Sequence, residues 1–381
     1  MLFLNRETDT GFTHIHISDI HFGAMNPKFQ YDLLTNGFTN KIKDINFDIL
    51  FLNGDLFHKS YMAESEPVFY AMTFIRDIVD ICKSKNASLI ILQGTLSHDG
   101  NQLRLFNDYT YMDDVDVRII REASIFTIKG VTITCIPEMY NMGKNYYVPY
   151  LNERSHICVV HGMLEDVIPV LKLNSKGLDD RVPLFKTSDF LNKDLVMAGH
   201  VHKRIIKDNF VYCGSPYNWS FGDDEPKGFY IVNQKYIDND YNINFIEIPS
   251  PRYIDIDIDN YIISNPKLES LIKIVEEKII ENNPTNNFRI CTTMASVNNL
   301  SIIQGLKIYF EKSKISSNIK FKINKVDKFS DDVEKFREES DKFGFVLNKN
   351  LTPFEALSMY IKVTTDAIIS PKEIEDIIKK E

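Results

Sequence analysis

Apolar and polar residues follow one another, in the first quarter of the chain, in a pattern that predicts strands and helices in turn. Apolar runs at residues 13–18, 47–53 and 88–93 predict strands, and amphipathic stretches at residues 29–44 and 67–84 predict helices between them. Strands separated by helices in this way form a parallel sheet that is buried on both faces. The chain therefore begins as an α/β layered domain.

A second set of strands follows with few helices between them. Short apolar runs predict these strands at residues 117–120, 125–128, 131–136, 157–160, 195–198, 210–213 and 228–232. Such strands build a second sheet, which has to bury its apolar face against the first. We therefore expect an α/β fold in which a two-sheet sandwich is flanked by helices.

The composition changes near residue 250, and the pattern beyond it predicts a smaller α/β unit. Strands and helices are expected in turn at residues 253–258, 268–281, 288–293, 300–312 and 319–326. The next stretch is rich in charge and is interpreted as a linker. The expected organisation is a main domain, a capping domain, this linker and a helical hairpin, at residues 1–249, 250–326, 327–350 and 351–381.

Two short helices are predicted at the end of the chain. Thr352-Pro-Phe-Glu355 and Ser370-Pro-Lys-Glu373 are both capping boxes with proline at the first helical position. Helices this short need a surface to cover their apolar side. That surface is either the protein's own body or a partner. The apolar side chains concerned are Phe354, Leu357, Ile361, Ile374, Ile377 and Ile378.

Composition restricts the class of protein without naming a function. The 381 residues carry a net charge of −9, which argues against holding DNA by bulk charge alone. Five scattered cysteines without a CxxC pair suit a reducing compartment. The chain shows no apolar run long enough for a membrane helix and no signal-peptide pattern, so we expect a cytoplasmic protein with no membrane association. Residue usage rich in Asn, Ile and Lys suggests an AT-rich genome, bacterial or viral.

Histidines and aspartates gather just after the predicted strands. In α/β folds, functional sites form in the crevice beyond the carboxyl ends of the strands. Five separate segments send proton-carrying or metal-binding groups to this place, which chance does not readily explain. The residues concerned are Asp19, His21, Asp55, His58, Ser97, His98, Asp99, His161, His200 and His202.

The donor types in this set favour a catalytic metal site. Carboxylate and imidazole without thiolate suit manganese, iron(II) or zinc. The ligands are too many for one ion, so we expect two ions, roughly 3.5–4 Å apart and bridged by Asp55. Two dications, the charges of Asp19 and Asp55 and a bridging hydroxide sum to about +1, so the site should prefer an anion such as a phosphate ester.

These motifs, in this order, resemble the calcineurin-like metallophosphoesterases. The match is closer to the SbcD-type nuclease subunits of the DNA double-strand-break repair complex. Gly54-Asp-Leu-Phe-His58, Gly199-His-Val-His-Lys203 and Tyr212-Cys-Gly-Ser-Pro216 carry the closer match. The resemblance spans residues 13–232 and extends loosely beyond. It implies a Mn²⁺-dependent DNA exonuclease and endonuclease that works as a homodimer with a coiled-coil ABC-type (SMC-like, SbcC-type) ATPase, which the terminal hairpin grips.

The resemblance also implies a role for each residue. Asp19, His21, Asp55 and His202 would hold the first ion, and Asp55, His161 and His200 the second. His98 would stabilise the phosphate or protonate the leaving oxygen, Asp99 would orient its ring, and His58 would assist near the substrate. Hydrolysis would proceed by in-line attack on phosphorus, with a nucleotide as the leaving group.

The third motif departs from the family. The family has Gly-Asn-His followed by Asp or Glu, and the Asn oxygen binds the second ion. Here the turn reads Gly94-Thr-Leu-Ser-His98-Asp99, which is two residues longer and has Ser97 where Asn belongs. Either Ser97 replaces Asn as a weak ligand, or water fills the position.

Other polar residues near the motifs receive more ordinary interpretations. His14 and His16 alternate with isoleucine in the first strand and are expected to be structural. Lys203 and Arg204 either contact the DNA backbone or are simply solvated. Trp219, in the turn after Gly214-Ser-Pro216, is expected to pack.

Three functions compete on this sequence. The first is the Mn²⁺-dependent DNA nuclease, and the second is a phosphatase or small-molecule phosphodiesterase of the same superfamily. The third is a non-catalytic scaffold whose working part is the terminal hairpin. A phosphomonoester compared with a DNA substrate separates the first two. Binding of an ATPase by a metal-bound but inactive protein would favour the third.

Overall fold

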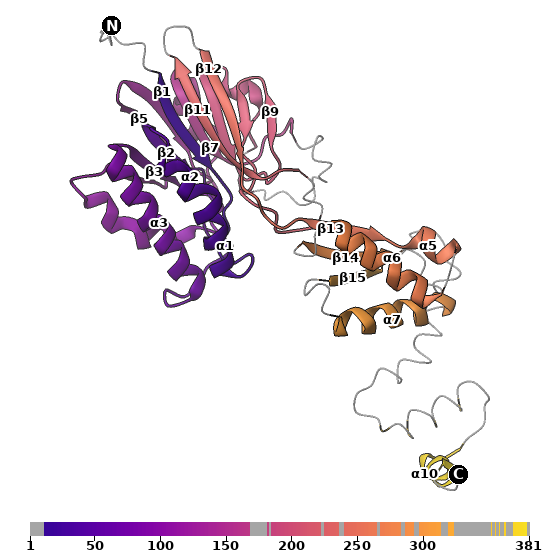
Figure 1. Cartoon of the computed structure of the whole chain (residues 1–381). Coiled ribbons are helices and arrows are strands. Elements are labelled where there is room, and N and C mark those ends of the chain that lie inside the picture. The colour runs from indigo at the N-terminus through magenta and orange to yellow at the C-terminus, as the bar shows by residue number, and fades with distance from the viewer. Residues whose placement is uncertain are drawn as a thin grey trace. The chain divides into compact units, whose positions relative to one another are not determined.

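A computed structural model gives the structure of the chain (Figure 1). It describes residues 11–167, 181–182, 184–221, 225–235, 240–264, 267–282, 286–292, 297–313 and 319–323, and near the end residues 352, 355, 358, 362 and 369–378. The chain divides into two compact units, one of residues 1–256, 273–289 and 309–320, the other of residues 257–272, 290–308 and 321–381. Within the described residues, no helix is long and apolar enough to cross a membrane.

The first sheet has six strands in the order β12-β11-β1-β2-β3-β4. Its strands are β1 (Phe12–Ile17), β2 (Ile49–Leu52), β3 (Ser88–Leu92), β4 (Val117–Ile120), β11 (Gly228–Lys235) and β12 (Asp240–Glu247). The first four are parallel neighbours, and β11 and β12 add antiparallel strands beside β1. The parallel part matches the strand–helix alternation of the sequence, whereas β12 was not predicted.

Helices cover one face of this sheet (Figure 1). α3 (Glu66–Lys85) buries a row of apolar side chains and ends at Asn86, whose backbone is left-handed. The helix expected at residues 29–44 is formed by α1 (Pro27–Leu34), a π-helical turn and α2 (Asn40–Lys43). The π-helical turn contains Gly37, where a Cβ atom would lie only 2.4 Å from the side chain of Ile248. Close packing at this glycine therefore coincides with the irregular turn.

The second sheet also has six strands, in the order β5-β6-β7-β8-β10-β9. These are β5 (Ser124–Ile128), β6 (Val131–Ile136), β7 (Ser155–His161), β8 (Lys193–Gly199), β9 (Ile205–Lys207) and β10 (Phe210–Tyr212). β6, β7, β8 and β10 are parallel neighbours. α4 (Lys144–Asn152), which the sequence did not predict because Pro149 interrupts its pattern, contributes Tyr147 and Leu151 to the core outside this sheet.

An apolar core lies between the two sheets. Phe51 and Ile90 of the first sheet pack in one cluster with Ile133 and Val159 of the second, and all four are fully buried. A separate core packs the first sheet against its helices. The molecule therefore contains an α/β sandwich of two large sheets with helices outside, as the pattern of the sequence predicted.

His14 and His16 lie inside this sandwich, and the prediction that they are structural is confirmed by their contacts. Nδ1 of His14 lies 2.6 Å from Nε2 of His16, and the ring of His16 stacks on Phe51. Both side chains are fully buried. Burial lowers the pKa of His14 to about 3, because a charged imidazole is poorly solvated there.

Acid should therefore destabilise the fold through His14. Between pH 6.5 and about 3 the unfolded chain binds a proton at this position and the folded chain does not, so stability falls as the pH falls through this range. The whole shift corresponds to about 5 kcal/mol, of which about 3 kcal/mol falls between pH 7 and pH 4. Urea unfolding in chelator at pH 7 and pH 4 measures it. His14→Asn should lose less stability than wild type between these pH values, and equal losses would contradict the assignment.

The remaining elements include a third sheet of three strands in the order β13-β14-β15, namely β13 (Tyr253–Asp257), β14 (Asn287–Thr292) and β15 (Ile319–Ile323). The helices of this region are α5 (Asp259–Ser264), α6 (Leu268–Glu281) and α7 (Val297–Lys312). All but α5 follow the predicted order. The domain boundaries at residues 249 and 326 stay predictions.

Both capping boxes form at the end of the chain. The carboxylate of Glu355 accepts hydrogen bonds from the backbone and hydroxyl of Thr352, and Glu373 does the same for Ser370, at 2.7–2.8 Å. The second box opens α10 (Pro371–Ile378). The predicted linker at residues 327–350, the side chains of Phe354, Leu357 and Ile361, and those of Ile377 and Ile378 lie outside the described residues.

Candidate metal centre

The predicted ligands follow strands that end at the same edges of the two sheets. Asp19 and His21 follow β1, Asp55 follows β2, His161 ends β7, and His200 and His202 follow β8. Parallel strands place their carboxyl ends side by side. The structure brings all six side chains into one cluster.

Asp55 lies at the middle of this cluster. Its Oδ2 is 3.5 Å from Nε2 of His21 and 3.4 Å from Nε2 of His161. His21 Nε2 is in turn 3.1 Å from His202 Nε2, which lies 3.8 Å from Oδ1 of Asp19. One carboxylate thus stands between histidines from both sheets, as the predicted bridging role requires.

The backbone is bent sharply at these positions. Asp19, His21, Asp55 and His200 have positive φ angles of 53°, 51°, 53° and 90°. Side-chain-bearing residues seldom adopt this conformation, and it concentrates at functional sites. Hydrogen bonds join the loop after β1 to the loop after β2. Asp19 N donates to the carbonyl of Gly54 at 3.1 Å, and His21 N donates to that of Asp55 at 2.9 Å.

Three glycines make room for the cluster. A Cβ atom on Gly54 would lie 2.2 Å from Nδ1 of His161, and one on Gly94 would lie 2.2 Å from Oδ1 of Asp55. One on Gly199 would lie 2.3 Å from the carbonyl oxygen of Asn53. No side chain fits at such distances. The glycines beside the motifs are therefore required by crowding.

Several groups of side chains in the cluster could hold a metal ion. One contains Asp19, His21 and His202, and another contains His161, His200 and a residue that the sequence did not single out, Glu138. In each group the ligand atoms lie within 4.8 Å of one another. These two groups divide the histidines as the resemblance divides them between the first and second ion.

Unsatisfied buried atoms show that the residues fit a cation. Nδ1 of His161 lies 2.7 Å from the carbonyl of Asn53, which can only accept, so Nδ1 carries a proton and Nε2 is the nitrogen that faces the cluster. Nε2 of His161, Nδ1 of His200 and Oε2 of Glu138 are buried without a hydrogen-bond partner. Buried polar groups are seldom left in this state. A cation between them would satisfy all three.

The side chains of the cluster shift one another's pKa values. Burial disfavours ionisation of Asp55, but the neighbouring His161 outweighs it and holds the pKa of Asp55 below its usual range. Burial opposes the charge on His161 too, yet Asp55 raises the pKa of His161 to about 10. For His21 burial dominates, and its pKa is well below the usual value. A cation that binds here has to replace a proton on His161.

His58 and His98 lie beside the cluster, and both are partly exposed. Their rings are 5.9 Å apart, and the ring of His98 is 4.8 Å from that of His21. Nδ1 of His98 hydrogen-bonds to the carbonyl of His58. Because a carbonyl only accepts, Nδ1 of His98 carries a proton and Nε2 is the nitrogen not engaged by this carbonyl.

The resemblance implied that Asp99 orients the ring of His98, but the structure gives Asp99 another role. The carboxylate of Asp99 instead accepts hydrogen bonds from the backbone N–H groups of Asp55, Leu56, Phe57 and Gly94, at 2.8–3.2 Å. The side chain is fully buried. Asp99 therefore ties the turn that carries His98 to the loop that carries Asp55, and the carbonyl of His58 orients the ring.

Ser97 is exposed on its turn. The residue of this turn that meets Asp55 is Thr95, whose N–H donates to Oδ1 at 2.6 Å and whose hydroxyl lies 3.4 Å from Oδ2. The two additional residues displace the serine from the position expected for the family's Asn. Its role as a ligand stays a prediction, which this placement does not favour.

Trp219 belongs to the site, although packing alone was expected of it. Its ring stacks on that of His21 at 4.9 Å and contacts the rings of His58 and His202 at 5.4 and 4.8 Å. The position of this tryptophan after a Gly-Ser-Pro turn does not predict contact with the histidines of the cluster. The contact depends on how the segment after β10 folds back over the loop after β1.

Lys203 and Arg204 differ in their surroundings. Lys203 is exposed. The guanidinium of Arg204 lies over the ring of Phe245 at 3.9 Å, and its backbone N–H donates to Glu225 at 2.8 Å. Arg204 is therefore engaged in packing within the protein, and contact of either residue with DNA stays a prediction.

Comparisons with known proteins do not assign the chain to a family. No protein-family model matches it, and no curated protein sequence matches it. One solved chain aligns over its whole length with 62% of this chain, at 12% identity and a TM-score of 0.38. A cold-active protein-tyrosine phosphatase of a psychrophilic Shewanella species aligns over 82% of its length with 62% of this chain, at 13% identity and a TM-score of 0.29. Similarity at this level does not bear on function.

Proposed function

We propose that this protein is a two-metal phosphodiesterase that cleaves DNA. One observation carries the proposal. Two carboxylates and four imidazoles from four strand ends meet in one cluster, and several of their buried atoms lack a partner that a cation would supply. The residues are Asp19, His21, Asp55, His161, His200 and His202. Mixed carboxylate and imidazole ligands suit Mn²⁺, iron(II) or zinc, and we propose Mn²⁺ because the motifs resemble those of Mn²⁺-dependent nucleases.

Two bound divalent cations would supply a nucleophilic water at neutral pH and neutralise charge on a phosphate. The chain's own residues would do the rest. His98, held through Nδ1 by the carbonyl of His58, would present Nε2 to the phosphate or to the leaving oxygen. Trp219 would keep the ring of His21 in place by stacking on it.

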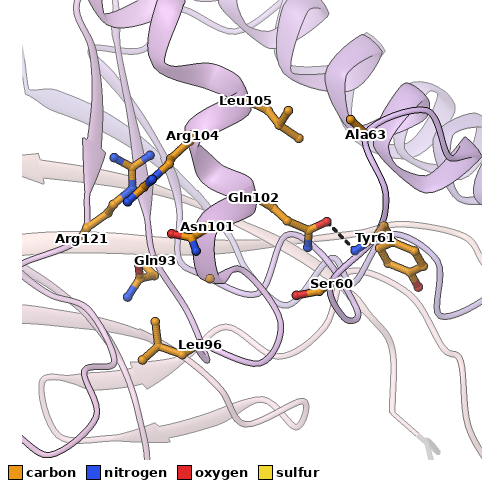
Figure 2. A pocket seen from close by; sticks show the side chains of 11 residues that line it. Ser60, Tyr61, Ala63, Gln93, Leu96, Asn101, Gln102, Arg104, Leu105 and Arg121 are labelled. Carbon is orange, nitrogen blue, oxygen red and sulfur yellow. Dashed lines mark hydrogen bonds between the residues drawn. The ribbon is translucent and has the colours of Figure 1, made fainter.

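A pocket beside the cluster supports a substrate with more than one phosphate. Its volume is about 620 Å³ (Figure 2). Gln102 lines it and also donates to the carbonyl of His98 at 3.0 Å, so pocket and catalytic turn share a wall. Arg104 and Arg121 lie close together in the lining, and burial together with the charge of Arg104 lowers the pKa of Arg121.

The two arginines suit an anion. Among the described residues, no ion pair joins either guanidinium to a carboxylate, and Nε of Arg121 is buried without a hydrogen-bond partner. A second phosphate, next to the one being cleaved, would relieve the repulsion between them and accept their hydrogen bonds. A polynucleotide offers this second phosphate, whereas a simple phosphomonoester does not.

The proposal is tested with purified, full-length protein and added Mn²⁺. Linear duplex DNA and a chromogenic phosphomonoester are compared, each with and without a chelator. Cleavage of DNA that chelator abolishes is expected. Strong turnover of the monoester with no cleavage of DNA would favour the second candidate, a phosphatase or small-molecule phosphodiesterase. DNA cleavage that survives the chelator would contradict both.

Replacing both arginines should separate the two candidates further. Arg104→Ala with Arg121→Ala should lower kcat/KM for DNA about 10²–10⁴-fold, because two charge-assisted contacts are lost and each contributes about 1.5–3 kcal/mol. Hydrolysis of a small phosphodiester, which has no second phosphate, should stay nearly unchanged. The double variant Lys28→Ala with Arg76→Ala, in which two exposed charges are removed elsewhere, serves as the control. Equal losses on both substrates would show that the pocket does not bind DNA.

Partners remain part of the same proposal. The helical hairpin at the end of the chain, whose two capping boxes are formed, would bind a coiled-coil ABC-type ATPase, and the protein would work as a homodimer. Isolated short helices are marginally stable, so the hairpin gains from a surface to pack on. Co-purification with such an ATPase should be lost when residues 351–381 are removed.

A further inference from the structure

We infer that Glu138 is a direct, anionic ligand of the second metal ion. This inference rests on the metal centre of the proposed function. It answers a question that the third motif leaves open. In the turn at residues 94–99, Thr95 meets Asp55 through its N–H and its hydroxyl, the carboxylate of Asp99 is occupied by backbone N–H groups, and Ser97 is exposed. The second ion would then have Asp55, His161 and His200 but no further protein ligand from that turn.

The fold brings Glu138 to the place where this ligand is needed. Glu138 follows the end of β6 (Val131–Ile136) by two residues. β6 is the parallel neighbour of β7, and β7 is that of β8. These strands end at the same edge of the second sheet, where β7 carries His161 and β8 leads into His200. The strand-end position that places the histidines also places this glutamate.

The carboxylate of Glu138 is buried and lies close to His161 and His200. Oε2 of Glu138 is 3.1 Å from Nδ1 of His200, and the residue is only 3% exposed. One ligand atom each from Glu138, His161 and His200 lies within 4.8 Å of the others. The side-chain amide of Gln93 donates to the backbone carbonyl of Glu138 at 3.2 Å and holds the loop in this position.

A second explanation is that Glu138 only orients His200 through a hydrogen bond. Carboxylates often serve metal-binding histidines in this way. The two atoms are close enough, yet neither takes part in a hydrogen bond of acceptable geometry, and Nε2 of His161 is unsatisfied beside them. Three unsatisfied atoms that face one another are explained by one cation and not by one hydrogen bond.

A ligating glutamate changes the charge of the centre. Two dications would be balanced by Asp19, Asp55, Glu138 and a bridging hydroxide, so the net charge becomes about zero instead of about +1. The centre itself would then attract an anionic substrate less strongly. Arg104 and Arg121, in the pocket beside it, would supply the missing positive field. The glutamate and the arginines would thus compensate each other.

Glu138→Gln tests the inference through metal binding. Glutamine keeps the size and an oxygen that could still accept a hydrogen bond from His200, but it loses the negative charge. Calorimetric titration of metal-free protein with Mn²⁺ should show two ions in the wild type. In the variant the second ion should bind at least about 100-fold more weakly. Glu122→Gln, at an exposed glutamate, is the matched control and should bind like wild type.

The outcomes decide between the two explanations. Two ions bound with unchanged affinity by Glu138→Gln would overturn the inference and leave Glu138 as an orienting residue at most. If the variant does not fold, which thermal unfolding of the metal-free protein reveals, a crystal of the wild type with Mn²⁺ decides instead. A carboxylate oxygen of Glu138 should then lie about 2.2 Å from an ion, and any separation too long for direct coordination would reject the inference.

Failure of the inference is distinct from failure of the proposed function. Metal titration uses no nucleic acid. A wild type that binds two ions and a variant that binds one would support the inference even if DNA is not cleaved. Cleavage of DNA by a protein whose second ion does not depend on Glu138 would retain the function and reject the ligand.

Discussion

Asp55→Asn should abolish metal-dependent hydrolysis, with a loss of roughly a thousand-fold or more in kcat/KM, which corresponds to about 4 kcal/mol. Asp55 is the carboxylate that stands between His21 of the first sheet and His161 of the second. If it bridges the two ions, its charge serves both, and no neighbour can replace it. Loss of any other single ligand should weaken one ion more than the other.

The substitution is suited to the site. Asparagine tolerates the left-handed backbone that Asp55 adopts, with φ of 53°. Its carbonyl oxygen can still accept the hydrogen bond from the N–H of Thr95. The loop should therefore persist, and what is lost is mainly charge. Asp32→Asn, at an exposed residue paired with Lys28, is the control for a charge lost elsewhere.

Thermal unfolding with and without Mn²⁺ gives a readout that does not depend on activity. A ligand at 100 times its dissociation constant stabilises the folded state by about 2.7 kcal/mol. Wild type and Asp32→Asn should gain this stability, and Asp55→Asn should gain far less. The comparison is made between the two metal states of each variant, because Asp55→Asn also removes the attraction to His161. An undiminished response to Mn²⁺ would disprove the bridging role.

The sequence predicts those site residues that directly follow an apolar strand, because the end of the strand fixes where they lie in the fold. β1, β2 and β3 are continuous apolar runs, and the residues that end them are forced to one edge of a parallel sheet. Asp19 and Asp55 can therefore be located from the order of apolar and polar residues alone. The same holds for His161 and for the Gly-His-Val-His segment after β8.

Glu138 shows where this reasoning ends. It obeys the same strand-end rule, but it stands alone after Pro137, without the glycine or histidine neighbours that mark the other motifs. A single glutamate in a loop is ordinary surface composition. Only its burial, and the two histidines that face it, reveal that it belongs to the centre.

Asp99 and Trp219 show a different limit. The role of Asp99 depends on four backbone N–H groups from two loops, and their meeting is a property of the assembled sheets. The position of Trp219 depends on the path of a turn across the loop after β1. The spacing of residues along the chain predicts neither of these roles. β12 was missed because Asp240, Asn242 and Asn244 interrupt its apolar residues, which is common in a strand at the edge of a sheet.

His98→Ala should lower kcat for DNA by about 10²–10⁴-fold, the usual range for a group that transfers a proton in the transition state. His98 is partly exposed, and its Nδ1 is engaged by the carbonyl of His58, so that Nε2 faces the site. Because the ring also lies near His21 and His58 in a group that could hold a metal, its effect has to be separated from metal binding.

Metal binding separates the two roles of His98. Binding of Mn²⁺ should be nearly unchanged in His98→Ala if the imidazole acts on the substrate, and one ion should be lost if it is a ligand. His156→Ala, at a histidine whose Nδ1 accepts from the backbone of Thr132, controls for loss of an imidazole outside the site. Full activity of His98→Ala would reject the catalytic role.

Asp99→Asn should affect stability more directly than His98→Ala does, because Asp99 holds the turn at residues 94–99 in place and does not orient the ring of His98. An amide has one acceptor oxygen, and its NH₂ group would face N–H donors that the carboxylate now satisfies. Each unsatisfied group costs about 1–3 kcal/mol. The free energy of unfolding should fall by about 2–6 kcal/mol for the two donors, with weaker binding of Mn²⁺ through the displaced loop of Asp55. A variant with normal stability and metal binding but reduced kcat would instead restore the role that the family resemblance implied.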